Sequence, residues 1–207
     1  MFYEPAKKNH GLPRDPFKAC VVPRPIGWVT TLDREGRPNL APYSFFNAIG
    51  SEPPLVCWAP GGLKPQGTLK DSLENVRATG EFVCNLATWA LREEMNRTSA
   101  GLEAGESEAD FAGLTFMPSQ AVKPPRVQES PVHLECRLWQ VLDLPADRPD
   151  SPQHLVIGQV VGIHIDDAVL TGDFVDIKKL RPIARLGYMD YGVVDTVFTM
   201  HRPAGGG

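Results

Sequence analysis

The stretch 132–138 alternates strictly between apolar and polar residues. Its apolar members are Val132, Leu134, Cys136 and Leu138. The residues between them are His133, Glu135 and Arg137. Successive side chains of a strand point to opposite faces, so this period of two predicts an antiparallel strand with its apolar face in the core and its polar face exposed. A chain that contains such a strand must pair it within a sheet.

A second stretch repeats the same spacing over 155–165. Its apolar members are Leu155, Ile157, Val161, Ile163 and Ile165. Gly158 and Gly162 lie on the other face, where we expect a bend, a bulge or a close neighbour. The curvature of a barrel requires glycines of this kind.

Four further strands are predicted from short apolar or β-branched runs, at Ile26–Leu32, Asn39–Asn47, Pro54–Ala59 and Glu81–Leu86. Gly36 stands where a hairpin between the first two needs a positive φ. The 20 prolines and 19 glycines are spread along the chain and indicate frequent turns. Six or more strands predict a mainly β protein, a closed or nearly closed barrel, because closure removes exposed sheet edges.

Helices are predicted to be few and short. Leu69, Leu73 and Val76 have helical spacing, Gly80 supplies a stop, and capping-box patterns place the start between Thr68 and Asp71. A second helix is expected at Thr88–Thr98, with Leu91 and Met95 inward, and a third, shorter one after Ser107.

Composition excludes several classes of function. A formal charge of −4 gives no overall basic field for nucleic acid or an anionic membrane. No window approaches the roughly 18 apolar residues of a membrane span, and the first 16 residues lack the apolar core of a secretory leader. The 4 cysteines are far apart and contain no C-x-x-C pair, so we expect reduced core residues in a cytoplasmic protein.

The usual catalytic signatures are also missing. The chain contains no G-x-G-x-x-G, G-x-S-x-G or H-E-x-x-H, and Gly62-x4-Gly67-Thr68 lacks the lysine of a P-loop. His133 and Cys136 would point to opposite faces of one strand, so no metal site is expected. Glu93 and Glu94 are adjacent on a helix and are interpreted as solvated charges. We therefore expect no catalytic acid or base.

Two segments could hold a flat, anionic ligand. Ser44-Phe45-Phe46-Asn47 offers a hydroxyl, two rings and an amide, although core phenylalanines beside a turn-forming asparagine would give the same pattern. Lys70-Asp71-Ser72 begins a helix, where free N–H groups, an ammonium and a hydroxyl favour an anion. Asp71 would repel a phosphate, so capping or orienting Lys70 is its expected role.

Together these segments resemble a known family. The runs PRPIGWVTTLDREGRPNLAPYSFFNAIGSEPPLV, TLKDSLENVRATGEFVCNLAT, VQESPVHLECRL and IARLGYMDYG are similar to motifs of the flavin reductase-like, FMN-binding split-barrel family. The resemblance implies one domain over 1–207, with its core at about 19–191. It also implies a six-stranded Greek-key split barrel, a homodimer, and FMN held non-covalently near the dimer interface.

The resemblance carries over to individual positions. It places Trp28, Thr30 and Thr31 against the flavin, and Ser44, Phe45, Phe46 and Asn47 beside its ring. Lys70, Asp71 and Ser72 match the family's K-D-T at the phosphate end, with serine in place of threonine. Arg185-Leu186-Gly187 matches the family's R-L-G-G, with Tyr188 replacing the second glycine, and we expect Tyr188 to narrow access to one side of the ring.

The function that the resemblance implies is NAD(P)H-dependent flavin reduction, in which hydride passes from the nicotinamide to flavin N5. The expected cofactors are FMN, with FAD as a further flavin substrate, and NAD(P)H as electron donor. A monooxygenase could receive the reduced flavin. The alternative is a flavoredoxin-like, FMN-containing electron carrier without NAD(P)H activity, and a ligand-binding module without redox turnover is a third reading.

Overall fold

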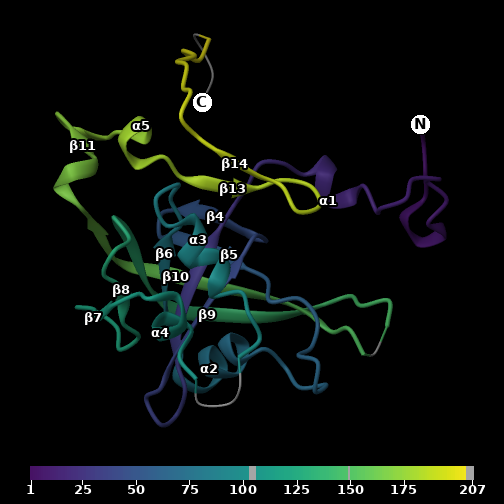
Figure 1. Ribbon diagram of the computed structural model, residues 1–207, viewed down its shortest axis with the longest axis horizontal. Helices are drawn as coiled ribbons and strands as arrows, with labels where there is room; N and C mark the ends of the chain where they lie inside the picture. Colours follow the sequence, from purple (N-terminus) through teal and green to yellow (C-terminus); the bar gives the residue numbers. More distant parts are fainter. Residues whose placement is uncertain (103–105, 149, 204–207) are drawn as a thin grey trace.

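The computed structural model describes residues 1–102, 106–148 and 150–203 (Figure 1). Seven antiparallel strands form its main sheet, in the order β3-β2-β6-β9-β10-β5-β4. Their bounds are β2 (Gly27–Leu32), β3 (Pro38–Tyr43), β4 (Phe46–Ser51), β5 (Pro54–Trp58), β6 (Glu81–Leu86), β9 (Val132–Leu144) and β10 (Gln153–Ile165). The sheet curves into a barrel, as the sequence predicts. Its two end strands, β3 and β4, do not pair, so the barrel is split.

Smaller sheets flank this barrel. One contains β1 (Arg24–Pro25), β13 (Ile183–Arg185) and β14 (Tyr191–Val193), and two-stranded sheets pair β7 (Phe116–Met117) with β8 (Arg126–Val127) and β11 (Leu170–Thr171) with β12 (Phe174–Val175). Figure 1 shows β13 and β14 at one end of the molecule and α2 at the other. The last described residues leave β14 as an extended segment that points away from the barrel.

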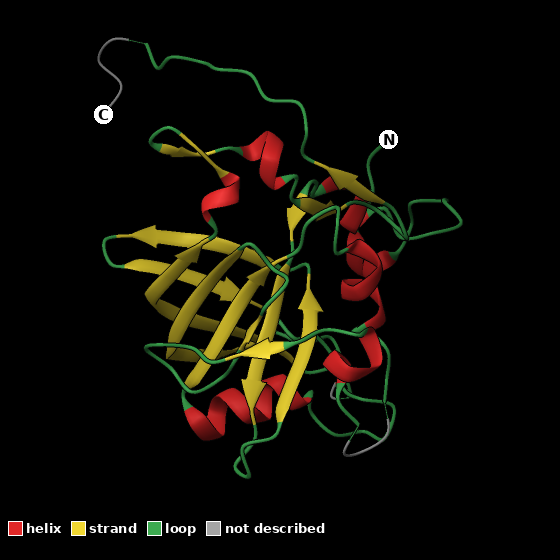
Figure 2. Ribbon diagram, turned by 60° about the vertical axis from the view of Figure 1, so that its left-hand side comes forward, coloured by secondary structure: helices red, strands yellow, loops and turns green. Residues whose placement is uncertain are grey.

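The helices are short, as expected. They are α1 (Phe17–Cys20), α2 (Asp71–Thr79), α3 (Arg92–Arg97), α4 (Glu108–Ala112) and α5 (Ile177–Leu180), with 3-10 turns at Pro5–Lys7 and Asp167–Val169. In Figure 2 α2 lies across one end of the large sheet. No helix within the described ranges is both long enough and apolar enough to cross a membrane.

The start and end of α2 follow the sequence, but its predicted capping box does not form. Gly80 ends the helix with a φ of 73°, the left-handed conformation that glycine adopts without steric cost. Lys70 is the N-cap residue, and its side chain makes no capping bond.

The predicted strand Asn39–Asn47 is divided into β3 and β4. Tyr43 ends β3, Phe46 begins β4, and the two residues between them form a bend. This division is the reason that the sheet has seven strands instead of six. The bend carries Ser44 and Phe45, which belong to the predicted ligand site.

The polar face of β9 is exposed only in part, because Arg137 is exposed as predicted but His133 and Glu135 are buried. His133 is 4% exposed and Glu135 is fully buried. The loop before β8 covers this face, and Glu135 accepts hydrogen bonds from the main-chain N–H groups of Gln120, Ala121 and Val122. Bonding of this kind offsets much of the cost of removing a carboxylate from water.

The glycines of β10 have the predicted role. The pairing register with β9 shifts between Ile157 and Gly158, and again between Val160 and Gly162, as at β-bulges. A Cβ built at Gly158 would lie 2.3 Å from Cζ of Phe82, so the ring packs directly on the backbone of β10.

The predicted helix Thr88–Thr98 is shorter than expected, because α3 begins at Arg92. Thr88 forms a bridge with Pro182, and the Trp89 N–H donates to the Arg181 carbonyl at 2.9 Å. These bonds hold the first residues of the segment against the chain before β13.

Two apolar clusters form the core. One lies between β2 and the α3–α4 region and includes Trp28, Leu40, Met95 and Ala109. The other fills the barrel and consists of Val29, Val56, Trp58, Leu73, Val76, Phe82, Cys84, Cys136, Val156 and Val160.

The cysteines only partly follow the prediction of a core location. Cys84 and Cys136 are buried and Cys57 is half-buried, whereas Cys20 is exposed at the end of α1. All of them are free thiols.

Candidate functional site

A pocket of about 300 Å³ lies between β1 and the start of β4. The residues that line it are Val21, Pro23, Arg24, Pro25, Ser44, Phe45, Phe46, Asn47, Cys57 and Leu155. It therefore contains the complete predicted segment Ser44–Asn47. Most of its other walls are apolar, and among the lining residues Arg24 alone carries a full charge.

The local fold fixes the segment Ser44–Asn47. The Phe45 carbonyl accepts the N–H of Ala59 at 2.9 Å, and Phe46 and Asn47 pair with Trp58 and Cys57 of β5. All four residues line the pocket, Ser44 and Phe45 from the bend and Phe46 and Asn47 from the start of β4.

Cys57 has no sign of a reactive thiol. Burial raises its pKa, an effect that a backbone hydrogen bond with Asn47 only partly opposes. The thiol therefore remains protonated near neutral pH, and a protonated thiol is a poor nucleophile.

Phe45 is 40% exposed and lies beside two cations. Lys18 Nζ is 5.8 Å from the centroid of its ring, and Arg24 Cζ is 5.9 Å from it. Lys18 itself is exposed, whereas Arg24 is only 6% exposed. The pocket wall thus combines an accessible aromatic ring with a buried positive charge.

Arg24 ties three parts of the chain together through neutral acceptors. Its two terminal nitrogens donate to the carbonyls of Lys18, Val21 and Leu186, the last two at 2.6 and 2.8 Å. Its Nε is buried and has no hydrogen-bond partner among the described residues. Burial, and then the nearby positive charge of Arg185, lower the pKa of the Arg24 guanidinium.

Three predicted site residues on β2 are buried in the protein instead of facing this pocket. Trp28, Thr30 and Thr31 have no exposed surface. Trp28 Nε1 donates to Thr98 Oγ1 at 2.8 Å, and the two threonine hydroxyls accept from the side-chain amides of Asn85 and Asn75. Core packing and these hydrogen bonds hold the three side chains within the protein.

The predicted phosphate segment at the start of α2 is also rearranged. Ser72 is 1% exposed, and its Oγ accepts hydrogen bonds from Asn39 Nδ2 and the Tyr43 hydroxyl, each at 2.9 Å. Asp71 neither caps the helix nor orients Lys70, because it forms an ion pair with Lys64 at 2.6 Å. Of the three predicted residues, Lys70 is half-buried and is the one whose positive charge could bind an anion.

One residue connects the two predicted segments. Tyr43 directly precedes Ser44, its hydroxyl reaches Ser72, and its ring stacks on Trp58 with a centroid distance of 4.9 Å. Burial raises the pKa of Tyr43 to about 12, so this phenol stays protonated and keeps its donor. Tyr43 thus links the segment that lines the pocket to the start of α2.

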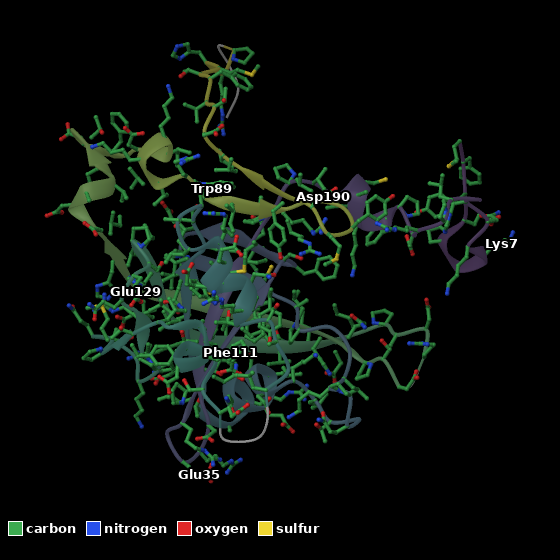
Figure 3. All side chains as sticks on the ribbon, in the orientation of Figure 1. Lys7, Glu35, Trp89, Phe111, Glu129 and Asp190 are labelled. Carbon is green, nitrogen blue, oxygen red and sulfur yellow. The ribbon has the colours of Figure 1, made fainter. Side chains whose placement is uncertain are left out.

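The backbone conformation of Tyr188 is one that favours glycine, the residue that the family pattern has at this position. Its φ is 57°, in the left-handed region that glycine favours, and its carbonyl accepts from Arg185 at 2.6 Å. Figure 3 shows Asp190 in the same turn, between β13 and β14 and close to α1. A Cβ at Gly187 would lie 2.5 Å from the Cβ of Ala19, so this turn packs tightly on α1.

The comparisons with known proteins identify the family. A model of the flavin reductase like domain matches residues 19–191. An uncharacterized protein of Halalkalibacterium halodurans is 37% identical over 184 residues, which cover 89% of this chain and 88% of that protein. The chain therefore belongs to the flavin reductase-like family.

Solved structures agree with this result. Nitrilotriacetate monooxygenase component B from Bacillus cereus has a TM-score of 0.87 and 28% identity, with 97% of this chain and 98% of that chain covered. The 2-nitrobenzoate 2-nitroreductase NbaA of Pseudomonas fluorescens has a TM-score of 0.83 and 26% identity, with 99% and 98% covered. This chain is thus similar to a monooxygenase component and to a nitroreductase along almost its entire length.

The pocket residues fit a flavin ring. The rings of Phe45 and Phe46 suit a flat aromatic group, and the Ser44 hydroxyl and Asn47 amide suit its polar edge. The partnerless Nε of Arg24 indicates that the protein alone does not satisfy this buried cation.

Sequence reasoning missed the part of the pocket that comes from 21–25 and from β10. The signal was present in Pro23-Arg24-Pro25, where a charged residue stands between two prolines just before an apolar strand. That signal gives Arg24 no role by itself, because residue type does not show whether the side chain is buried.

Proposed function

We propose that this protein binds FMN non-covalently and reduces flavin with NADH or NADPH as electron donor. The observation that carries the proposal is the pocket in which two phenylalanine rings, a hydroxyl, an amide and a buried guanidinium surround about 300 Å³. Membership in the flavin reductase-like family supports an oxidoreductase role. FAD is proposed as a further flavin substrate.

The bound flavin would supply the chemistry, since its N5 accepts the hydride of a nicotinamide. The protein's residues bind, orient and shield the ring. Phe45 and Phe46 provide apolar surface, while Ser44 and Asn47 hydrogen-bond the polar edge. Trp28, Thr30 and Thr31 support this wall from the core through β2. No side chain is assigned as a catalytic acid or base.

The phosphate of FMN is proposed to bind near the start of α2. Lys70 is the N-cap residue of α2 and is followed by N–H groups without helical partners. Ser72 and Asp71 act indirectly in this proposal. Ser72 fixes Tyr43, and Asp71 holds Lys64.

A homodimer is proposed from the exposed edge of the main sheet. β4 is the end strand, and Ile49 at its centre is 49% exposed. An unpaired sheet edge that exposes an apolar side chain is a common docking surface for another chain, and β4 also borders the pocket. A second copy there would shield the exposed side of the flavin from water.

The proposed downstream partner is a monooxygenase in the cytoplasm. The support for this partner is the similarity to component B of nitrilotriacetate monooxygenase. Free thiols at all of the cysteines fit a reducing compartment.

The test is a visible spectrum, the identity of the acid-released cofactor, and steady-state oxidation of NADH and NADPH with added FMN or FAD. We expect flavin absorbance or quenching of FMN fluorescence on titration, together with nicotinamide oxidation. Flavin binding without nicotinamide oxidation would favour the flavoredoxin-like alternative, and a colourless protein that does not quench FMN would refute both. Light scattering should give a mass of about two chains, and a value near 22.7 kDa would contradict the dimer.

A further inference from the structure

Arg24 is a buried cation without a counter-charge. It is 6% exposed, its terminal nitrogens bond only neutral carbonyls, and no described carboxylate forms an ion pair with it. The neighbouring charge that affects the pKa of Arg24 is Arg185, which is also a cation. An unpaired buried charge is costly, and proteins usually compensate it with an opposite charge.

The location of Arg24 indicates where the compensating charge would come from. Arg24 lines the pocket together with Phe45, and its guanidinium carbon lies 5.9 Å from the centroid of that ring. A ligand that fills the pocket would therefore meet the positive charge on a largely apolar wall. In such a wall the effective dielectric constant is low and the charge acts strongly.

We propose that Arg24 is the counter-charge for the anionic, two-electron-reduced form of the flavin ring. This inference rests on the proposed function, because it needs the ring in this pocket. Oxidised flavin is neutral and gains little from the cation, whereas the reduced ring carries a delocalised negative charge. Arg24 would thus bind the product of reduction more tightly than the substrate, which makes the reduction more favourable.

The phosphate is a poorer match for this position. Three of the five N–H groups of the Arg24 guanidinium already donate to carbonyls, so only two are left for the several oxygens of a phosphate. The pocket around it is formed mostly by apolar residues such as Val21, Pro23 and Leu155. A diffuse charge on a flat ring suits this wall better than a compact dianion.

The test compares the affinities of oxidised and reduced FMN, measured anaerobically in mildly alkaline buffer. For Arg24→Gln we expect the affinity ratio of reduced to oxidised FMN to fall about tenfold or more. A tenfold fall corresponds to a two-electron midpoint potential of the bound flavin that is about 30 mV lower. Arg24→Lys should keep most of the ratio, because it keeps the charge.

Lys18→Gln is the matched control. This change removes the other cation beside the Phe45 ring, whose Nζ lies 5.8 Å from the ring centroid. Unlike Arg24, Lys18 is exposed, so water screens its charge. We expect less than about a twofold change in the ratio.

Several outcomes would overturn the inference. An equal loss for oxidised and reduced FMN would mean that Arg24 only braces the chain. A loss for FMN in both states, but none for riboflavin, would mean that Arg24 binds the phosphate. In contrast, a wild-type protein that binds no flavin would refute the proposed function itself.

A measurement on the wild-type protein covers the case in which Arg24→Gln does not fold. With ¹⁵N-labelled arginine, the buried Nε–H of Arg24 should give a protected resonance. We expect this resonance to shift when the bound flavin is reduced. An unchanged resonance would contradict the proposal.

Discussion

The ring of Phe46 packs directly on the backbone of Gly27. A Cβ built at Gly27 would lie 2.6 Å from Cδ2 and 2.8 Å from Cγ of that ring. Gly27 begins β2 and Phe46 begins β4, so this contact joins the core strand to the pocket wall across the split of the barrel. The position of the pocket therefore depends on the absence of a side chain at residue 27.

Gly27→Ala should weaken flavin binding by displacing Phe46. Because the ring must move, we expect destabilisation by about 1–3 kcal/mol together with a loss of FMN affinity. Urea denaturation and FMN fluorescence titration measure the two effects. Gly192→Ala is the control, since its Cβ would meet Leu186 at an ordinary 3.5 Å and should change neither. Unchanged FMN affinity in Gly27→Ala would argue against Phe46 as part of the ring site.

Ser72→Ala should act on stability. The change removes the acceptor of both Asn39 and Tyr43 in a buried position, which costs about 1–3 kcal/mol. Tyr43→Phe should recover part of this loss in the double variant, because it removes one of the orphaned donors. The exposed Ser51 provides a control, and Ser51→Ala should leave the denaturation midpoint unchanged. A wild-type midpoint for Ser72→Ala would contradict this assignment.

Much of the fold could be predicted because its signals are local. Alternation over 132–138, the turn at Gly36 and the stop at Gly80 each depend on neighbouring residues only. The glycines of β10 were also identifiable, since a glycine within a period-two pattern indicates a bulge or a close neighbour.

The predictions that were wrong concern contacts between segments that are distant in sequence. Glu135 has the pattern of an exposed residue, and it is buried because residues 120–122 supply three N–H donors from a loop that the alternation does not reveal. The first turn of the predicted helix Thr88–Thr98 does not form, because these residues bond to Arg181 and Pro182 instead. A periodicity within one segment contains no information about such partners.

The candidate site was predictable only in part for the same reason. Ser44–Asn47 could be found, because rings and polar groups are adjacent in sequence there. The burial of Arg24 and Ser72 was not predicted, because residue type does not reveal burial. The Ser72 hydroxyl oxygen accepts hydrogen bonds from two side chains of β3.

The stability of the protein should decrease as the pH falls below about 6.5, the ordinary pKa of histidine. Burial lowers the pKa of His133 in the folded state, an effect that its hydrogen bond to the Val127 carbonyl only partly opposes. Between the folded pKa and about 6.5 the unfolded chain therefore binds a proton that the folded chain excludes, which costs at most about 1.4 kcal/mol per pH unit.

The measurement for His133 is the free energy of unfolding in urea at several pH values. In His133→Gln, whose amide can still reach the Val127 carbonyl, this loss should be smaller than in the wild type. The neighbouring Arg126, Glu135 and His164 are present in both proteins and cancel in the comparison. Identical pH profiles for the two proteins would mean that His133 does not titrate as proposed.

A further loss of stability is expected below about pH 4.5, the ordinary pKa of Glu135. Burial raises the pKa of this carboxyl, but N–H donors from Gln120 and Ala121 and the contact with His164 outweigh burial and lower it. The stabilisation is therefore present above about 4.5 and disappears as the pH falls through the folded value. Glu135→Gln should be less stable at neutral pH and should lack this acidic step, and a persistent step in that variant would contradict the assignment.

Lys70→Gln should distinguish the contribution of the phosphate to FMN affinity from that of the ring. If Lys70 contacts the FMN phosphate at the start of α2, its loss removes a charge-assisted hydrogen bond of about 1.5–3 kcal/mol, which is about a 10- to 160-fold loss in affinity. Riboflavin has no phosphate and should bind Lys70→Gln and the wild type equally well, so the ratio of the two affinities is the quantity to measure. Lys123→Gln, which removes an exposed lysine from the loop before β8, should leave both affinities unchanged. Equal weakening of FMN and riboflavin in Lys70→Gln would mean that the change disturbs the ring pocket through α2, and the phosphate would then have to be placed elsewhere.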